Sequence, residues 1–147
     1  AAHRVEIATR VTGELKRLWW TDLLAALVED VTRNYRVDRS RIYLTGTSLG
    51  GYTAWTLAWL DDRYAAIVPL SAWGYPDEVT QAADVPVWAF HGDGDFIVPA
   101  HRHEKLVEAH REAGGQSRWS VLSGGHDITQ QVYSLQELYD WLLQQRR

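Results

Sequence analysis

Four short apolar runs, each followed by a helical segment or a loop, most strongly restrict how this chain can fold. Helical segments between apolar strands require right-handed crossovers, which place the strands parallel in one sheet with helices on both faces. We therefore expect an α/β fold with a mainly parallel sheet of about four to five strands. The predicted strands are residues 41–45, 65–70, 85–90 and 118–122.

Helical periodicity and end signals fill the segments between these strands. Apolar side chains recur three or four positions apart in the predicted helices, which are residues 21–35, 49–60, 101–113 and 135–145. Ser134 and Glu137 have the spacing of a capping box at the start of the last helix. Gly114 and Gly115 are typical of the end of the helix before it.

Length and composition restrict the class of protein. A chain of 147 residues has the usual size of one domain, so we expect a single domain over residues 1–147. Its 15 Lys and Arg against 19 Asp and Glu give a net charge of −4, which argues against a nucleic-acid partner. The chain has no cysteine, and no apolar run reaches the ~20 residues of a membrane span. We expect a soluble chain with neither a signal peptide nor a membrane partner, in a compartment that composition leaves open.

The first predicted strand runs into a tight turn with the pattern G-x-S-x-G. The pattern comprises Gly46, Ser48 and Gly50 and lies between a strand and a helix, the context in which such a serine is a nucleophile. We expect glycine to be required at positions 46 and 50, because a side chain there would collide with neighbouring backbone. The turn would raise the Ser48 hydroxyl to the helix N-terminus, where the Leu49 N–H faces developing negative charge. The alternative is an ordinary helix cap after a tight turn.

The loops after two later strands hold the partners that a serine nucleophile needs. Asp95 follows the strand at 85–90, and His126 follows the strand at 118–122. A serine hydroxyl needs a base to take its proton, and the base needs a carboxylate to fix its tautomer. In parallel sheets such groups meet beyond the carboxyl ends of the strands. The sequence therefore predicts Ser48, His126 and Asp95 as nucleophile, base and orienting acid.

Other residues compete for these roles. His91 is an alternative base, although a histidine at the end of a strand is more often buried and bonded to loop backbone. Asp93 is an alternative acid on the same loop, whereas Asp127 is expected to bond local backbone. His91, His101 and His103 could join Asp93 and Asp95 around a metal. The sequence lacks helical metal-ligand spacing and a calcium-loop pattern, however. We expect no metal and no cofactor.

Four motifs in order make the chain resemble α/β-hydrolase esterases. They are Asp38 to Tyr52 with Gly46-Thr47-Ser48-Leu49-Gly50-Gly51, Arg63 to Pro69, His91-Gly92-x-x-Asp95 with Val98-Pro99, and Gly125-His126-Asp127. The branch is that of phospholipase/carboxylesterase and polyhydroxybutyrate-depolymerase-like or feruloyl-esterase-like enzymes, near prolyl-oligopeptidase-like peptidases. The resemblance, over residues 19–145, implies that Ser48 is the nucleophile, Asp95 the acid, His126 the base and the Leu49 N–H one oxyanion donor.

The N-terminus departs from this resemblance. Family members carry several strands before the nucleophile strand and a loop that supplies the second oxyanion donor, whereas residues 1–18 here form an atypical segment. We expect the donor from a partner chain, from residues 15–20 or from water. The strand at 41–45 would become an exposed edge, which favours pairing with another chain. Residues 4–11, which alternate like a strand, or a second copy would cover it, so we expect a homo-oligomer.

The aromatic residues divide by position. Trp55, Trp59 and Trp141 lie on predicted helices and are expected in the core. Trp73 and Tyr75 follow the carboxyl end of a strand and are candidates to line a substrate pocket.

We therefore expect a serine esterase that cleaves small or accessible carboxylic esters through an acyl-enzyme. A peptidase or a thioesterase of the same fold is the alternative within this class. The alternative from another class is a catalytically weak remnant or fragment, kept for binding or assembly.

Overall fold

Four parallel strands form one sheet in the order β1-β2-β3-β4. The computed structural model describes residues 19–147 of the chain. The strands are β1 (Ile42–Thr47), β2 (Tyr64–Leu70), β3 (Val87–Gly92) and β4 (Ser117–Leu122). All four predicted strands are confirmed, with small displacements at their ends. The strand predicted at residues 4–11 lies outside the described residues.

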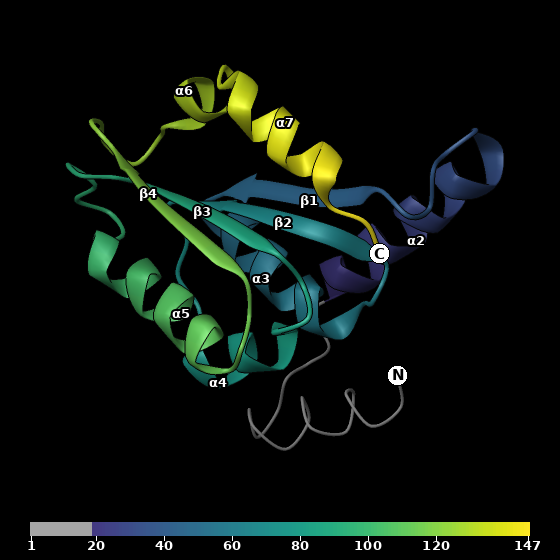
Figure 1. Ribbon diagram of the computed structural model, residues 1–147, viewed down its shortest axis with the longest axis horizontal. Coiled ribbons are helices and arrows are strands. Elements are labelled where there is room, and N and C mark those ends of the chain that lie inside the picture. Colours follow the sequence, from purple (N-terminus) through teal and green to yellow (C-terminus); the bar gives the residue numbers. More distant parts are fainter. Residues whose placement is uncertain (1–18) are drawn as a thin grey trace.

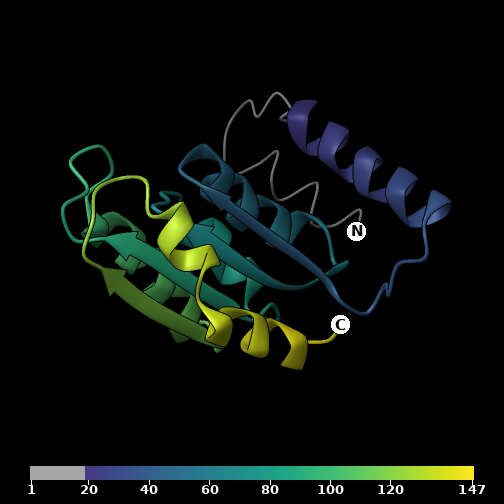
Figure 2. The same ribbon diagram turned by 90° about the horizontal axis from the view of Figure 1, so that it is seen from above.

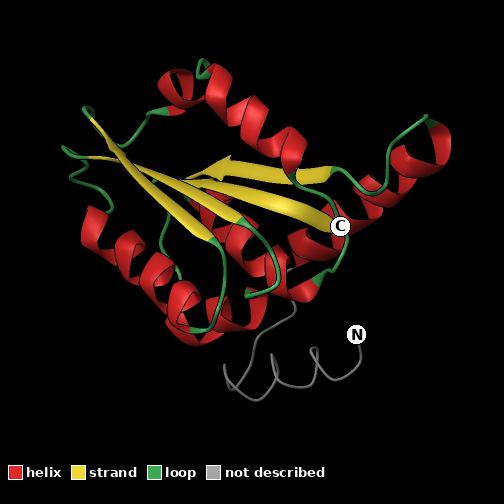
Figure 3. Cartoon of the chain, viewed as in Figure 1, coloured by secondary structure: helices red, strands yellow, loops and turns green. Residues whose placement is uncertain are grey.

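Helices cover both faces of this sheet, as Figures 1 and 3 show. One face carries α3 (Leu49–Leu60), α4 (Pro76–Val79), the short η1 (Thr80–Ala82) and α5 (Ala100–Glu112), and the other carries α6 (Thr129–Tyr133) and α7 (Gln136–Gln144). Helix α2 (Trp19–Asn34) precedes β1 and lies outside the layer formed by α3, as Figure 2 shows. The four longer helices were predicted, whereas α4, η1 and α6 are too short to show a periodicity. Within residues 19–147, no helix has the length and apolar character needed to cross a membrane.

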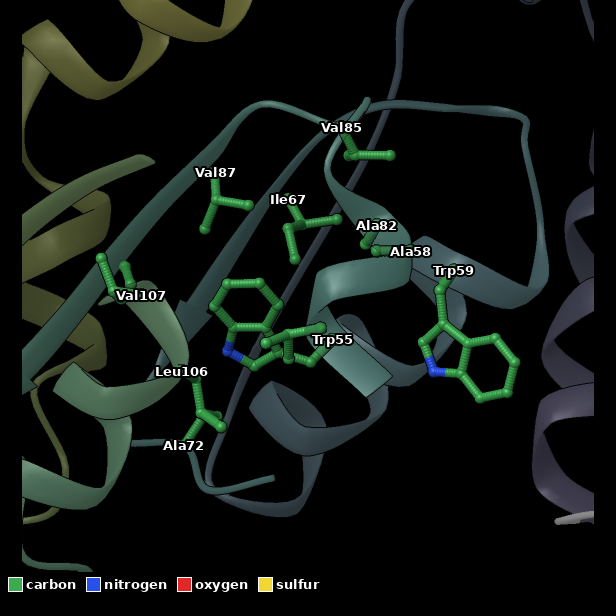
Figure 4. Packing of buried hydrophobic residues seen from close by; sticks show 12 residues of the cluster. Trp55, Ala58, Trp59, Ile67, Ala72, Ala82, Val85, Val87, Leu106 and Val107 are labelled. Carbon is green, nitrogen blue, oxygen red and sulfur yellow. The ribbon is translucent and has the colours of Figure 1, made fainter. Parts of the chain in front are cut away.

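The strands separate two apolar clusters. Trp55 and Trp59 of α3 pack with Ile67 on one face, in the cluster shown in Figure 4, and both indole side chains are buried. On the other face, Trp141 of α7 packs against Trp88 with ring centroids 5.5 Å apart. The predicted core positions of the three helical tryptophans are therefore confirmed. This two-sided burial is what a parallel sheet requires.

Strand β1 is an edge of the sheet, because within the described chain it pairs only with β2. This agrees with the exposed edge expected from the sequence. The homo-oligomer inferred from that edge stays a prediction.

The two predicted helix-end signals have different outcomes. Gly114 has φ 91° and follows α5, and the N–H of Gly115 donates to the His110 carbonyl, so the glycine ending is confirmed. The capping box is wrong, because α7 begins after Leu135 without a side-chain cap. The Ser134 hydroxyl donates instead to the Gln131 carbonyl at 2.8 Å. Leu135 therefore occupies the N-cap position of α7, one residue after the serine that the motif indicates.

Close backbone packing shapes the turn between β1 and α3. A Cβ on Gly46 would lie 2.6 Å from the Gly50 carbonyl carbon, so the requirement at position 46 is confirmed. The requirement at Gly50 is wrong, because a Cβ there would have no neighbour within 4 Å. The crowded position is Gly51, where a Cβ would lie 2.7 Å from the Ala72 Cβ. The first turn of α3 thus contacts the end of β2 one residue later than the motif indicates.

The two adjacent glycines therefore predict opposite effects. Gly51→Ala should lower the free energy of unfolding by about 1–3 kcal/mol, because the added methyl overpacks the contact with Ala72. Gly50→Ala should raise it by about 0.5–1 kcal/mol, because alanine favours the helix and meets free space. Urea denaturation of both variants measures these changes. Equal destabilisation by the two substitutions would contradict the assigned packing.

Two fully buried histidines on α5 contribute polar groups to the core. The His110 ring bonds the Ser117 hydroxyl at 2.6 Å and the Ala82 carbonyl at 3.0 Å. Burial lowers the pKa of His110 below its ordinary 6.5, although its carbonyl partners and Asp84 oppose this effect. Burial, followed by the nearby His91, lowers the pKa of His103 well below 6.5. Both rings are therefore neutral in the folded protein near neutral pH.

These lowered pKa values predict that acid destabilises the fold. Below pH 6.5 the unfolded chain binds protons that the folded chain does not, so stability falls as the pH drops toward the folded pKa values. Each histidine contributes up to about 1.4 kcal/mol per pH unit. His110→Gln should reduce this slope in denaturation curves recorded across pH. The matched control is His101→Gln at an exposed position of the same helix, and an unchanged slope in His110→Gln would contradict the interpretation.

Candidate active site

Ser48 lies at the carboxyl end of β1 and is the single residue that joins this strand to α3. Its backbone has φ 59° and ψ −116°, a conformation that a residue with a side chain rarely adopts. The Ser48 N–H donates to the Leu70 carbonyl at 2.9 Å, and its carbonyl accepts the Tyr52 N–H at 3.0 Å. Bonds to β2 and to α3 thus hold this strained turn in place. Strain of this kind is concentrated at functional sites.

Leu49 is the first residue of α3. Helix geometry leaves the first N–H groups of a helix without an acceptor inside it, and the helix dipole makes that end attractive to negative charge. The Leu49 N–H is therefore available next to Ser48.

Asp95 and His126 are brought together from the loops after β3 and β4. His126 Nδ1 lies 2.8 Å from Asp95 Oδ2. The other carboxylate oxygen, Oδ1, accepts the N–H groups of Ile97 and Val98, both at 2.9 Å. The Asp95 side chain is fully buried, whereas the His126 side chain retains 20% exposure. The histidine is thus accessible while its partner is fixed.

The bonds to Asp95 decide its ionisation. Burial raises the pKa of this carboxyl group, but the hydrogen bonds from His126, Val98 and Ile97, together with the charge of His126, lower it further than burial raises it. The resulting pKa lies below the ordinary 3.8. Asp95 is therefore a carboxylate at neutral pH, and it accepts a hydrogen bond from the Nδ1–H of His126.

The other acidic candidates, Asp93 and Asp127, bind loop backbone and do not bind the His126 ring. Asp93 Oδ1 accepts the Gly124 N–H at 3.0 Å, and the Gly94 N–H donates to the Gly124 carbonyl at 2.8 Å. Asp127 accepts the Thr129 N–H at 3.0 Å, the local backbone bond expected from the sequence. Asp93 thus ties the acid loop to the histidine loop.

The remaining histidines belong to the interior or the surface. His91 is fully buried and its Nε2 lies 2.8 Å from the Val98 carbonyl, the loop contact that the sequence indicates. The same nitrogen is 3.0 Å from Asp95 Oδ2. His103 is buried beside His91, and His101 is exposed. In the part of the chain that the structure describes, no three His, Cys, Asp or Glu side chains are grouped as metal ligands.

An aromatic group lies over the start of α3. Trp73 stacks on Tyr52 with ring centroids 5.8 Å apart and planes 6° apart, and Tyr75 meets Tyr52 edge-on. Tyr52 comes one helical turn after Ser48. Tyr75 is 58% exposed and Trp73 is half-buried. Trp73 and Tyr75, the two residues considered for a substrate pocket, therefore pack on the helix that begins beside Ser48. Their role in binding stays a prediction.

Sequence reasoning missed two features of this site. Ser71, directly after β2, has φ 45°, and its buried hydroxyl has no hydrogen-bond partner among the described residues. The contact of His91 with Asp95 was also missed. The position of Ser71 beyond a strand's carboxyl end was an available signal, whereas no motif identifies its conformation.

Comparisons with known proteins find similar chains among esterases and a peptidase. A thermostable esterase of known structure is 30% identical, with a TM-score of 0.79 over 85% of this chain and 36% of its own. The bifunctional acetylxylan esterase/xylanase XynS20E of Neocallimastix patriciarum is 24% identical over 93 residues, which are 63% of this chain and 14% of that protein. The acylaminoacyl peptidase of Pyrococcus horikoshii, 14% identical with a TM-score of 0.72 over 83% of this chain and 27% of its own, shares the fold. The chain thus spans about a third or less of the length of these proteins.

The family comparison agrees with the resemblance drawn from the motifs. The model of the dienelactone hydrolase family, part of the α/β-hydrolase superfamily, matches residues 3–127. This range includes β1 to β4 and the loops that carry Ser48, Asp95 and His126. The chain therefore belongs to the dienelactone hydrolase family.

Proposed function

We propose that the chain is a serine hydrolase that cleaves carboxylic esters. The observation that supports this most strongly is the 2.8 Å contact between His126 and the buried Asp95. It lies at the edge of the sheet where Ser48 occupies its strained turn. A serine on such a turn, with an imidazole oriented by a carboxylate at the same edge, is the arrangement that acyl transfer requires.

In the proposed reaction, Ser48 Oγ attacks the ester carbonyl carbon while His126 Nε2 takes its proton. The Leu49 N–H donates to the oxyanion that forms. His126 then gives the proton to the departing alcohol, which leaves an acyl group on Ser48. Water loses a proton to His126 and attacks the acyl carbon. His126 returns that proton to Ser48 Oγ as the bond to the acyl carbon breaks and the acid leaves. Asp95 keeps the His126 proton on Nδ1 and stabilises the imidazolium throughout.

The substrate class proposed is a small or accessible ester. The similarity to the thermostable esterase and to the acetylxylan esterase supports ester cleavage. We propose that Trp73 and Tyr75 line the pocket for an acyl or aromatic group of the substrate, because they pack over the helix that begins beside Ser48. Amide or thioester cleavage would use the same three residues, and the fold shared with a peptidase leaves that alternative in place.

Ser48→Ala should lower kcat for an activated short ester by a factor on the order of 10⁶, because the nucleophile is lost. The matched control is Ser123→Ala, which removes an exposed hydroxyl on the loop of His126. It should retain the wild-type rate. Equal turnover by the Ser48→Ala variant and the wild type would contradict the assignment.

A panel of matched esters, thioesters and amides tests the substrate class. We expect the highest kcat/KM for the esters. A preference for amides or thioesters would identify the chain as a peptidase or thioesterase. The absence of turnover on every activated ester would favour a remnant kept for binding or assembly.

A further inference from the structure

Two buried histidines lie behind Asp95, and the proposed reaction uses neither of them. His91 lies on β3 and His103 on α5, and both rings are fully buried. His91 Nδ1 lies 3.1 Å from His103 Nδ1, and His103 Nε2 lies 3.2 Å from the indole Nε1 of Trp55. Together with the 3.0 Å contact between His91 Nε2 and Asp95 Oδ2, these contacts form a continuous polar network from α3 to the proposed acid.

The partners in this polar network determine which ring nitrogen of His91 and of His103 carries the proton. The Trp55 indole can only donate, so His103 Nε2 accepts and the His103 proton is on Nδ1. That proton is donated to His91 Nδ1, which leaves the His91 proton on Nε2. His91 Nε2–H then faces two acceptors, Asp95 Oδ2 and the Val98 carbonyl. The Ala72 N–H also faces His103 Nδ1, at 3.3 Å. The opposite tautomers would leave His91 Nε2 without a proton between two groups that can only accept, and would place a proton on His103 Nε2 against the Trp55 N–H.

His91 fixes the loop residue that binds the carboxylate. Oδ1 of Asp95 accepts two backbone N–H groups, from Ile97 and Val98, and Oδ2 accepts from His126. His91 Nε2–H donates to the Val98 carbonyl at 2.8 Å and lies 3.0 Å from Oδ2. His91 therefore holds, from its carbonyl side, the residue whose own N–H binds Asp95.

We propose that His91 is a positioning residue for Asp95, and that His103 and Trp55 set its tautomer. The proposal rests on the proposed function, because positioning Asp95 matters through His126. By donating to the Val98 carbonyl, His91 fixes the loop that holds the carboxylate in the orientation that meets His126 Nδ1. The role explains why two imidazoles are buried where apolar side chains would pack without a polar penalty. His91 contacts no substrate in this proposal.

The kinetic test compares three variants. His91→Leu removes the donor and should lower kcat about 10–100-fold, the usual effect of losing an outer partner of a functional group, with KM unchanged. His91→Gln can place an amide N–H near the Val98 carbonyl and should recover most of the lost rate. His110→Leu removes an equally buried histidine that does not contact Asp95. It should lower the thermal stability but retain the kcat of the folded protein.

A spectroscopic test separates this proposal from the proposed function. Nitrogen-15 NMR of the histidine rings should show His91 protonated at Nε2 and His103 at Nδ1, whether or not any ester is cleaved. The slowly exchanging His126 Nδ1 proton should be lost in His91→Leu and kept in His91→Gln and His110→Leu. A His126 Nδ1 proton that persists in folded His91→Leu, or a His91 proton on Nδ1, would overturn the proposal. Failure of ester turnover with the predicted spectra would contradict the proposed function alone.

Discussion

The parallel order of the strands is the constraint on which the site depends. It sends the carboxyl ends of β1, β3 and β4 to the same edge, where the Thr47 hydroxyl lies 2.9 Å from the Thr129 hydroxyl. The loops after β3 and β4 approach so closely that a side chain on Gly92 would overlap the Gly125 carbonyl. Bonds from Gly124 to Asp93 and Gly94 hold the two loops together. The short distance between Asp95 and His126 follows from this backbone packing.

Burial of Asp95 has an energetic consequence for the whole site. An ionised carboxylate removed from water is costly unless its oxygens are fully hydrogen-bonded. Three hydrogen bonds, from the N–H groups of Ile97 and Val98 and from His126, offset that cost, and His91 Nε2 lies 3.0 Å from Oδ2. Each donor can reach Asp95 only if its stretch of backbone is held in place. The polar network therefore determines the loop structure as well as the ionised state of Asp95. Stability and the proposed chemistry are therefore coupled at one side chain.

The sequence predicts the framework well where the signal is local and repeated. Helix α3 begins and ends at the predicted residues, and the apolar strands appear in their predicted order. The positions of Ser48, Asp95 and His126 follow from turn motifs at strand ends. The remainder depends on contacts between distant segments. The crowding at Gly51 comes from β2, and the contact of His91 with Asp95 is formed by a loop that folds back over the end of β3. The apparent capping box failed because α7 begins one residue later, with Leu135 at its N-cap position.

The most direct measurement of the central claim is covalent labelling by a fluorophosphonate probe, followed by mass spectrometry of the modified peptide. Such a probe reacts with a serine that a neighbouring base activates. We expect a single adduct on Ser48 in the wild-type chain and none in Ser48→Ala. Equal labelling of both proteins, or an adduct on another residue of the wild type, would contradict it.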